Sequence, residues 1–463
     1  MNSPSAREQL AVAGAPASER ARAFGLSWFT YASYYLGRKG FSVVKSSLSR
    51  QFGFDPAALA LIDSVYLLAY ALGQLPSGLA VDRWGSRRVL TFGLLLSAAA
   101  CAVFGASAGL LAFCVCFALN GLAQSTGWPG TTKIVAQWTE PATRGRTMGA
   151  WSTCYQVGGI AATALATWLL GHHGWRAAFY APAAWLAANA LLVTTWLPQA
   201  RERVSQDAEL DTSASNPAAS ASEREALEAA AVARAARALV RDATQDAAAR
   251  SPHPDAASSA GTRALRTPAL YAFGASYFCI KLIRYSLLFW LPFYLHTAGG
   301  FDEVQSGYLS IGFEVGGVAG SVGIGYLSDR WRESRSLVAA LSLAALALAL
   351  YAYASVALHS ALWHFSLLAA VGALLFGPDA LVSGAAAQEA AGPRAAGTAV
   401  GLVNGLGSAG ALLQGALTIG VQRVAGWDGV FYSFVALALA AAGCLLPNLR
   451  RRPDAVPYVA HSR

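Results

Sequence analysis

Long apolar segments recur along this chain, and most of them hold about 20 residues between charged or turn-forming positions. A segment of that length crosses the hydrocarbon core of a bilayer as one helix. Hydrophobic residues make up 55% of the 463 residues and charged residues only 13%. A soluble domain carries about 25% charged residues, so a soluble enzyme and a disordered chain are both excluded. The sequence therefore predicts an all-α membrane protein.

Charged residues, glycines and prolines divide the apolar sequence into twelve candidate transmembrane helices. We expect two six-helix bundles, 23–198 and 268–449, joined by a polar cytoplasmic linker at 199–267 and flanked by tails at 1–22 and 450–463. The twelve expected spans lie near residues 24–44, 58–81, 89–106, 110–138, 148–170, 175–197, 270–296, 305–327, 337–357, 362–388, 398–424 and 427–449.

Arginines gather in alternate loops and in both tails, whereas the opposite loops hold little beyond Arg50, Arg176 and Arg423. Positively charged loops remain in the cytoplasm during membrane insertion. Both termini and the linker are therefore expected to be cytoplasmic, with the inner (plasma) membrane as the site of insertion. The net charge of +9 is explained by this orientation, and no nucleic acid is expected as a partner.

The chain repeats itself at an interval of about half its length. Residues 78–84 (GLAVDRW) recur as 325–331 (GYLSDRW), and Pro129 in the fourth span corresponds to Pro378 in the tenth. A parallel repeat of six spans with a central cytoplasmic loop resembles the major facilitator superfamily. The repeated loop is similar to the loop motif of that superfamily, and the resemblance implies a gating role for Asp82, Arg83, Asp329 and Arg330.

Several basic residues stand inside apolar spans, where a charge at the helix centre costs about 2.5–3.5 kcal/mol. Arg38 lies in the first span, 44 positions before Asp82, and Arg284 lies in the seventh, 45 positions before Asp329. The two arginines are therefore repeat mates at a similar membrane depth. In a carrier built from two halves, we expect them to face each other across the central cavity.

Two guanidinium groups suit a divalent tetrahedral anion, because each presents a planar pair of donors to phosphate oxygens. Lys281 precedes Arg284 by one helical turn and shares its face. Lys45 lies roughly two turns, or ~10 Å, outward from Arg38 on its face, where it can contact the ligand or reach the membrane surface. Lys39 is expected to reach the membrane surface. Three tyrosines that flank Arg38 can donate hydroxyl hydrogen bonds to a ligand or serve in packing: Tyr31, Tyr34 and Tyr35.

Four segments of the chain resemble the organophosphate:inorganic phosphate antiporters, which include glycerol-3-phosphate and hexose-6-phosphate transporters. They are 34–41 (YYLGRKGF), 120–129 (NGLAQSTGWP), 281–292 (KLIRYSLLFWLP) and 314–317 (EVGG). The third is most similar to the sugar-phosphate exchanger branch. The resemblance covers both bundles and implies that Arg38 and Arg284 bind phosphate.

The chain also departs from the glycerol-phosphate carriers. Gln74 stands where they have a lysine, Tyr155 where they have a histidine, and Lys281 where they have a tyrosine, and we expect all three to contact the substrate. Glu314 matches an acid of the family and is expected to pair with Lys281 or Arg284, either beside the ligand or as a packing pair. These departures leave glycerol-3-phosphate, a sugar phosphate and a phosphoglycerate open as substrates.

The predicted function is secondary active exchange of an organophosphate for inorganic phosphate, performed by a monomer in the lipid bilayer. No enzyme activity, cofactor or metal is expected, because the sequence holds no catalytic triad, metal-ligand pattern or phosphate-cradling glycine loop. Two alternatives remain open. One is a membrane sensor of external sugar phosphate. The other is a proton-coupled facilitator of another organic anion or drug, for which Asp63, Glu314 and Asp379 are the candidate acids.

Overall fold

The structure is a computed structural model. The residues that it describes are 15–139, 144–198, 266–330, 335–355, 360–391 and 396–449. Apart from its last two residues, the predicted linker 199–267 lies outside these ranges, as do positions 1–14 and 450–463 of the predicted tails.

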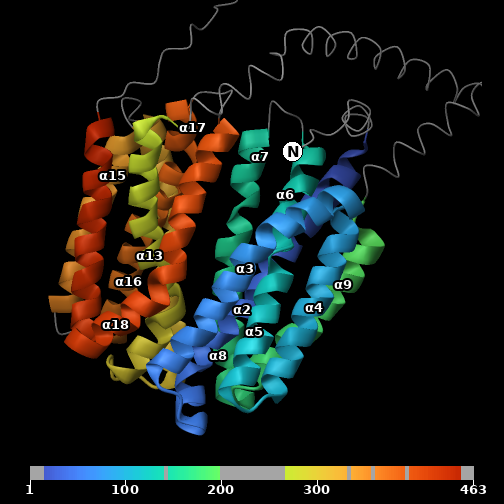
Figure 1. Cartoon of the computed structure of the whole chain (residues 1–463), viewed down its shortest axis with the longest axis horizontal. Coiled ribbons are helices and arrows are strands. Elements are labelled where there is room, and N and C mark those ends of the chain that lie inside the picture. The colour runs from blue at the N-terminus through green and yellow to red at the C-terminus, as the bar shows by residue number, and fades with distance from the viewer. Residues whose placement is uncertain are drawn as a thin grey trace, which may run out of the picture.

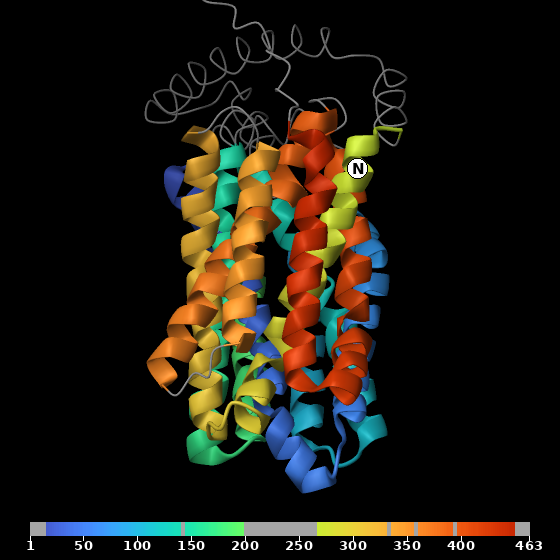
Figure 2. The same cartoon turned by 90° about the vertical axis from the view of Figure 1, so that its left-hand side faces the viewer.

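Helices make up the regular structure of these residues, and they form two bundles that stand side by side (Figure 1). The first bundle contains α2 (Ala17–Phe52), α3 (Pro56–Trp84), α4 (Ser86–Ala106), α5 (Leu110–Gln124), α6 (Gly127–Gln137), α7 (Arg144–Trp151), α8 (Thr153–His173) and α9 (Ala177–Trp196). The second contains α13 (Pro268–Thr297), α14 (Glu303–Arg330), α15 (Arg335–Ser355), α16 (Ala361–Ala380), the π-helix η1 (Leu381–Ala385), α17 (Ala386–Ala391), α18 (Ala396–Leu445) and the 3₁₀ helix η3 (Leu446–Asn448). The helix axes of the second bundle are nearly aligned with one another, and the first bundle lies behind them (Figure 2).

All twelve predicted spans fall on helices, so the predicted fold class is confirmed. The last two spans are merged in α18, which is broken at Gly426, where φ is 68°. Within the described residues, eight helices are long and apolar enough to cross a membrane, and α2, which carries Arg38, is not among them. The first helix begins at Ala17, inside the predicted tail, and runs on to Phe52.

Local chemistry sets the breaks between helices. Gly53 ends α2 with φ of 67°, a left-handed conformation that glycine adopts without strain. Asp55 then accepts a hydrogen bond from the Ala58 backbone N–H and caps α3. In the second bundle, Pro378 lies near the end of α16, and the chain continues as the π-helix η1. Such irregular turns change the direction in which the following side chains point.

The two bundles are joined most firmly at the end opposite the linker, which we call the far end. The other end, where α9 ends and α13 begins, is the linker end. An aromatic cluster at the far end includes Phe41 and Phe117 from the first bundle and Trp290 and Phe293 from the second. The ribbons of the two bundles also converge in that direction (Figure 1).

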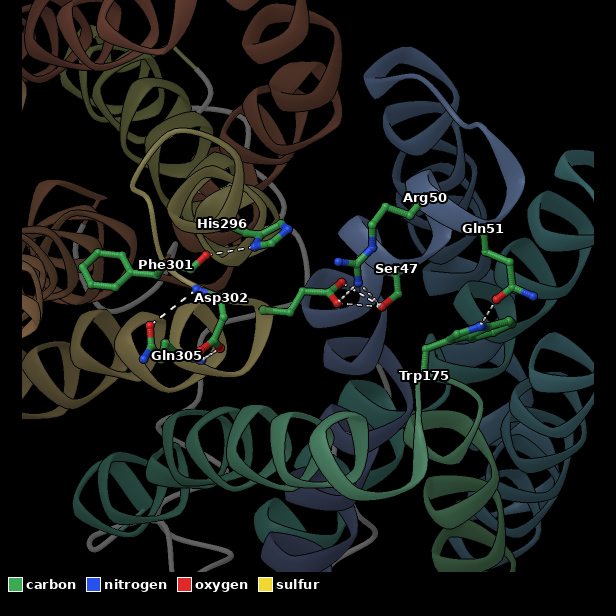
Figure 3. Close-up of polar contacts among 9 residues, drawn as sticks. Ser47, Arg50, Gln51, Trp175, His296, Phe301, Asp302 and Gln305 are labelled. Atoms are coloured by element: carbon green, nitrogen blue, oxygen red, sulfur yellow. Dashed lines mark hydrogen bonds and ion pairs between the residues drawn. The ribbon is translucent and has the colours of Figure 1, made fainter.

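Two ion pairs link the bundles at the far end, one with its cation in the first bundle and the other with its cation in the second. Arg50 of α2 binds Glu303 of α14, and Arg423 of α18 lies 3.1 Å from Asp55. Figure 3 shows Ser47 and Arg50 converging on one carboxylate, which belongs to Glu303; the Ser47 hydroxyl donates to it at 2.7 Å. At the linker end, Lys133 pairs with Asp82 inside the first bundle and Arg335 with Glu389 inside the second.

Candidate functional site

Arg38 lies midway along α2 among aromatic rings. Its guanidinium carbon is 4.1 Å from the centre of the Tyr35 ring and 5.9 Å from that of Tyr70. Nε and Nη2 of Arg38 are buried and have no hydrogen-bond partner among the described residues. These two nitrogens form one edge of the guanidinium plane, the edge that binds two oxygens of a phosphate or carboxylate.

Hydrogen bonds from neighbouring helices fix the backbone just before Arg38. The Asn120 side chain donates to the Gly37 carbonyl at 2.8 Å and accepts from the Ser97 hydroxyl at 2.6 Å. A Cβ at Gly37 would lie 3.0 Å from Nε2 of Gln124, so a larger residue would disturb this contact. The segment 120–129 therefore positions the arginine without contacting its guanidinium.

Arg284 lies in α13 and carries a partner that Arg38 lacks. Its Nη1 donates to Oδ2 of Asp379 at 2.8 Å, and its guanidinium carbon lies 4.4 Å from the Phe376 ring centre. Nε of Arg284 and Oδ1 of Asp379 are both buried without a partner in the described part of the chain. This ion pair is therefore incomplete: one donor and one acceptor remain available.

Both arginines lie near tyrosines of the first bundle. Tyr35 interacts electrostatically with both Arg38 and Arg284, and the Arg284 guanidinium lies 5.7 Å from the ring centre of Tyr155 on α8. Arg284 thus reaches across the boundary between bundles. That the two repeat-related arginines face each other across a central cavity stays a prediction.

Lys281 and Lys45 have different surroundings. The Lys281 ammonium is half-buried, donates to the Ser408 hydroxyl at 3.3 Å and lies 4.9 Å from the Tyr277 ring centre. Lys45 is fully buried, binds the equally buried Asp63 and lies 3.6 Å from the Trp290 ring centre. The structure therefore brings Lys281 to the face of Arg284, whereas Lys45 is enclosed in an ion pair under the aromatic cluster of the far end.

The expectation that Lys39 reaches the membrane surface is wrong. Its side chain is 4% exposed and lies 3.2 Å from Oε1 of Glu314, in the other bundle. Glu314 thus pairs with Lys39 and not with Lys281 or Arg284, because α14 packs directly against α2 and α8 here. Gly159 of α8 leaves the space for this carboxylate, since a Cβ there would lie 2.5 Å from Oε1 of Glu314.

The other predicted ligand contacts differ in accessibility. Tyr34 is fully buried, and its hydroxyl hydrogen-bonds to Thr126 at 3.0 Å. Tyr31 packs its ring against Trp128, at 5.5 Å between ring centres. Gln74 is half-buried and interacts with Tyr70. Of these, Gln74 interacts with a tyrosine that lies beside Arg38, whereas the Tyr34 hydroxyl is already bonded to Thr126.

The predicted gating residues lie at the linker end. Asp82 accepts from Lys133 at 2.8 Å, and Arg83 and Arg330 are exposed. The side chain of Asp329 lies outside the described side chains. The Asp82–Lys133 pair links α3 to α6 within one bundle.

The sequence argument missed two parts of the site. Tyr66 and Tyr70 both interact with Arg38, and their spacing of four on one helix face, followed by Gln74, was a usable signal. Asp379 was one of three acids in the spans, and the sequence argument assigned it no partner. Its position directly after Pro378, the repeat mate of Pro129, was the available sign that it stands at the level of the site.

Comparisons with known proteins identify the family of the chain. The model of the Major Facilitator Superfamily matches residues 27–415. Sugar phosphate exchanger 3 of Bos taurus is 30% identical, with 92% of each chain covered. Glucose-6-phosphate exchanger SLC37A2 of Danio rerio is 30% identical over 91% of this chain and 90% of its own.

Among solved structures, a bacterial homolog of the human lysosomal transporter Spinster, in an inward-facing and unoccupied conformation, superposes with a TM-score of 0.71. It is 15% identical and covers 94% of this chain and 98% of its own, so it supports the fold alone. The chain is an integral multi-pass membrane protein that belongs to the major facilitator superfamily, in the branch that holds the sugar phosphate exchangers.

Proposed function

We propose that this protein exchanges an organophosphate for inorganic phosphate across a membrane by alternating access. The observation that carries the proposal is the buried Nε–Nη2 edge of Arg38, which has no partner among the described residues and lies near Tyr35, a side chain that also interacts with Arg284 of the other bundle. Such an edge matches two phosphate oxygens. The names of the Bos taurus and Danio rerio relatives, a sugar phosphate exchanger and a glucose-6-phosphate exchanger, support a phosphorylated substrate.

We assign the ligand contacts to the side chains that surround the two guanidinium groups. Lys45 and Glu314 serve in ion pairs instead, and Tyr34 and Tyr31 serve in packing. The assigned contacts are Arg38, Arg284, Lys281, Tyr35, Tyr155 and Gln74.

Exchange, as opposed to one-way transport, follows from the charges. The contacts of Arg38 and Lys281 among the described residues are with neutral side chains, which include Tyr35 and Tyr70 beside Arg38 and Ser408 and Tyr277 beside Lys281. Closing the bundles around these two cations without a ligand would bury like charges together, which is costly. A bound dianion removes that cost, so the protein crosses between its two states only when loaded.

The ion pairs indicate which state is described. At the far end two pairs join the bundles, whereas the Asp82–Lys133 and Arg335–Glu389 pairs of the linker end stay within one bundle. We infer a state closed at the far end. The basic loops place the linker and both termini on the cytoplasmic side of the inner membrane. The site of this state then opens toward the cytoplasm.

Purified protein in liposomes tests the exchange. Uptake of radiolabelled phosphate is measured into vesicles preloaded with unlabelled phosphate and into empty vesicles, and external glucose-6-phosphate and glycerol-3-phosphate are added as competitors. We expect rapid uptake only into loaded vesicles and inhibition by an organophosphate. Equal uptake into both would refute exchange, and phosphate binding without uptake would favour a sensor.

A further inference from the structure

The charges in the middle of the described helices balance in a specific way. Five cations stand there, Arg38, Lys39, Lys45, Lys281 and Arg284, and three carboxylates, Asp63, Glu314 and Asp379. Each carboxylate has one cationic partner. Five positive charges minus three negative ones leave two, which equals the charge of one phosphate monoester dianion.

Asp379 differs from the other two carboxylates in its surroundings. The Asp63 pair is enclosed beneath aromatic rings, and Glu314 is held by Lys39 and by the Thr163 hydroxyl at 3.3 Å. Asp379 is 5% exposed and its Oδ2 accepts a hydrogen bond from Arg284. Its Oδ1 has no partner among the described residues. A buried carboxylate oxygen without a donor is costly, so a group that approaches it gains most by donating a hydrogen bond.

The unpartnered atoms around the two arginines therefore form a mixed set. Nε and Nη2 of Arg38 and Nε of Arg284 are donors, and Oδ1 of Asp379 is an acceptor. The oxygens of a phosphate monoester dianion satisfy the donors, but they carry no proton and so cannot donate to Oδ1. A hydroxyl group of the organic part can, and it adds no charge to the balance.

We propose that Asp379 determines specificity, selecting phosphate monoesters whose organic part carries hydroxyl groups and rejecting those that carry a carboxylate. This inference rests on the proposed function and narrows it. A phosphoglycerate would bring three negative charges to a site with two uncompensated cations, and its carboxylate would meet the Asp379 carboxylate as a like charge.

The test compares two ligands that share a three-carbon skeleton and a terminal phosphate. Glycerol-3-phosphate ends in a hydroxymethyl group and 3-phosphoglycerate in a carboxylate. Their dissociation constants are measured from ligand-induced thermal stabilisation of the full-length protein in detergent, and their inhibition constants from phosphate exchange in liposomes. We expect the wild-type protein to prefer glycerol-3-phosphate at least tenfold, and Asp379→Asn to reduce this preference about tenfold.

Two further variants keep the test decisive. Asp379→Glu retains the carboxylate and should retain the preference. Asp428→Asn makes the same chemical change at an exposed acid near the far end and should leave the preference unmoved. Equal binding of both ligands by wild-type protein, or an unchanged ratio in Asp379→Asn, would overturn the inference. A binding preference without any phosphate exchange would refute the proposed function and leave the inference standing.

Discussion

The regions around the two repeat-related arginines differ although their helices correspond. Arg38 stands among tyrosines and contacts no carboxylate of the described residues, whereas Arg284 is bound to Asp379. The sequences also differ directly after the corresponding prolines, because Gly130 follows Pro129 and Asp379 follows Pro378. The difference shows that a symmetric framework holds an asymmetric site, in which one arginine is free to bind a ligand and the other is partly neutralised.

The largest effect is expected from Arg38→Lys. Lysine keeps the charge but removes the two-donor edge, and loss of a partner from a buried charged pair costs about 2–5 kcal/mol. Phosphate exchange should fall about thirtyfold or more, with thermal stability close to that of the wild-type protein. Exposed Arg88→Lys is the matched control. Near-normal exchange by Arg38→Lys would remove the contrast between the two arginines.

A complete buried pair provides the next comparison. Lys39 and Glu314 are 4% and 6% exposed, and removing one partner leaves an uncompensated buried charge that costs about 3–5 kcal/mol. Thermal unfolding in detergent should show this loss for Lys39→Met and for Glu314→Gln. The double variant should recover most of it. Additive losses in the double variant would mean that the two side chains do not compensate each other.

Arg284→Lys should have a smaller effect than Arg38→Lys. Asp379 already occupies part of the Arg284 guanidinium, and an ammonium can still bind that carboxylate. We expect phosphate affinity, measured by calorimetry, to weaken about tenfold, or about 1.4 kcal/mol. A loss equal to that of Arg38→Lys would show that the two regions contribute alike.

The smallest effect is expected from the exposed pairs at the far end. Arg423 and Asp55 are 58% and 59% exposed, and such a pair contributes about 0.2–1 kcal/mol. Arg423→Gln leaves the helix cap at Asp55 intact and should raise the population open at the far end roughly 1.5- to fivefold. Spin-label distances between the bundles at low salt report this population. An unchanged distribution of spin-label distances would show that the Arg423–Asp55 pair does not help to keep the far end closed.

The fold could be predicted from the sequence because the bilayer requires each spanning helix to hold about 20 mostly apolar residues. Apolar length predicted the spans, and the recurrence of Pro129 as Pro378 predicted the two related bundles. The partners of the charges could not be predicted in the same way. Lys39 and Glu314 are 275 positions apart, and their contact depends on how closely α2, α8 and α14 pack. Likewise, the contact between Arg284 and Asp379 depends on how α13 and α16 pack, which residue types alone do not specify.

The central claim is that two uncompensated positive charges bind one dianion, and the pH dependence of ligand binding tests it most directly. The second pKa of a phosphate monoester is about 6, so most of the ligand is a dianion at pH 7.5 and only about a tenth of it at pH 5. Calorimetry with glycerol-3-phosphate should give an affinity about tenfold weaker at pH 5 than at pH 7.5, following the titration of the ligand. Equal affinity at both pH values would contradict the account, because the site would then bind a monoanion as well as a dianion.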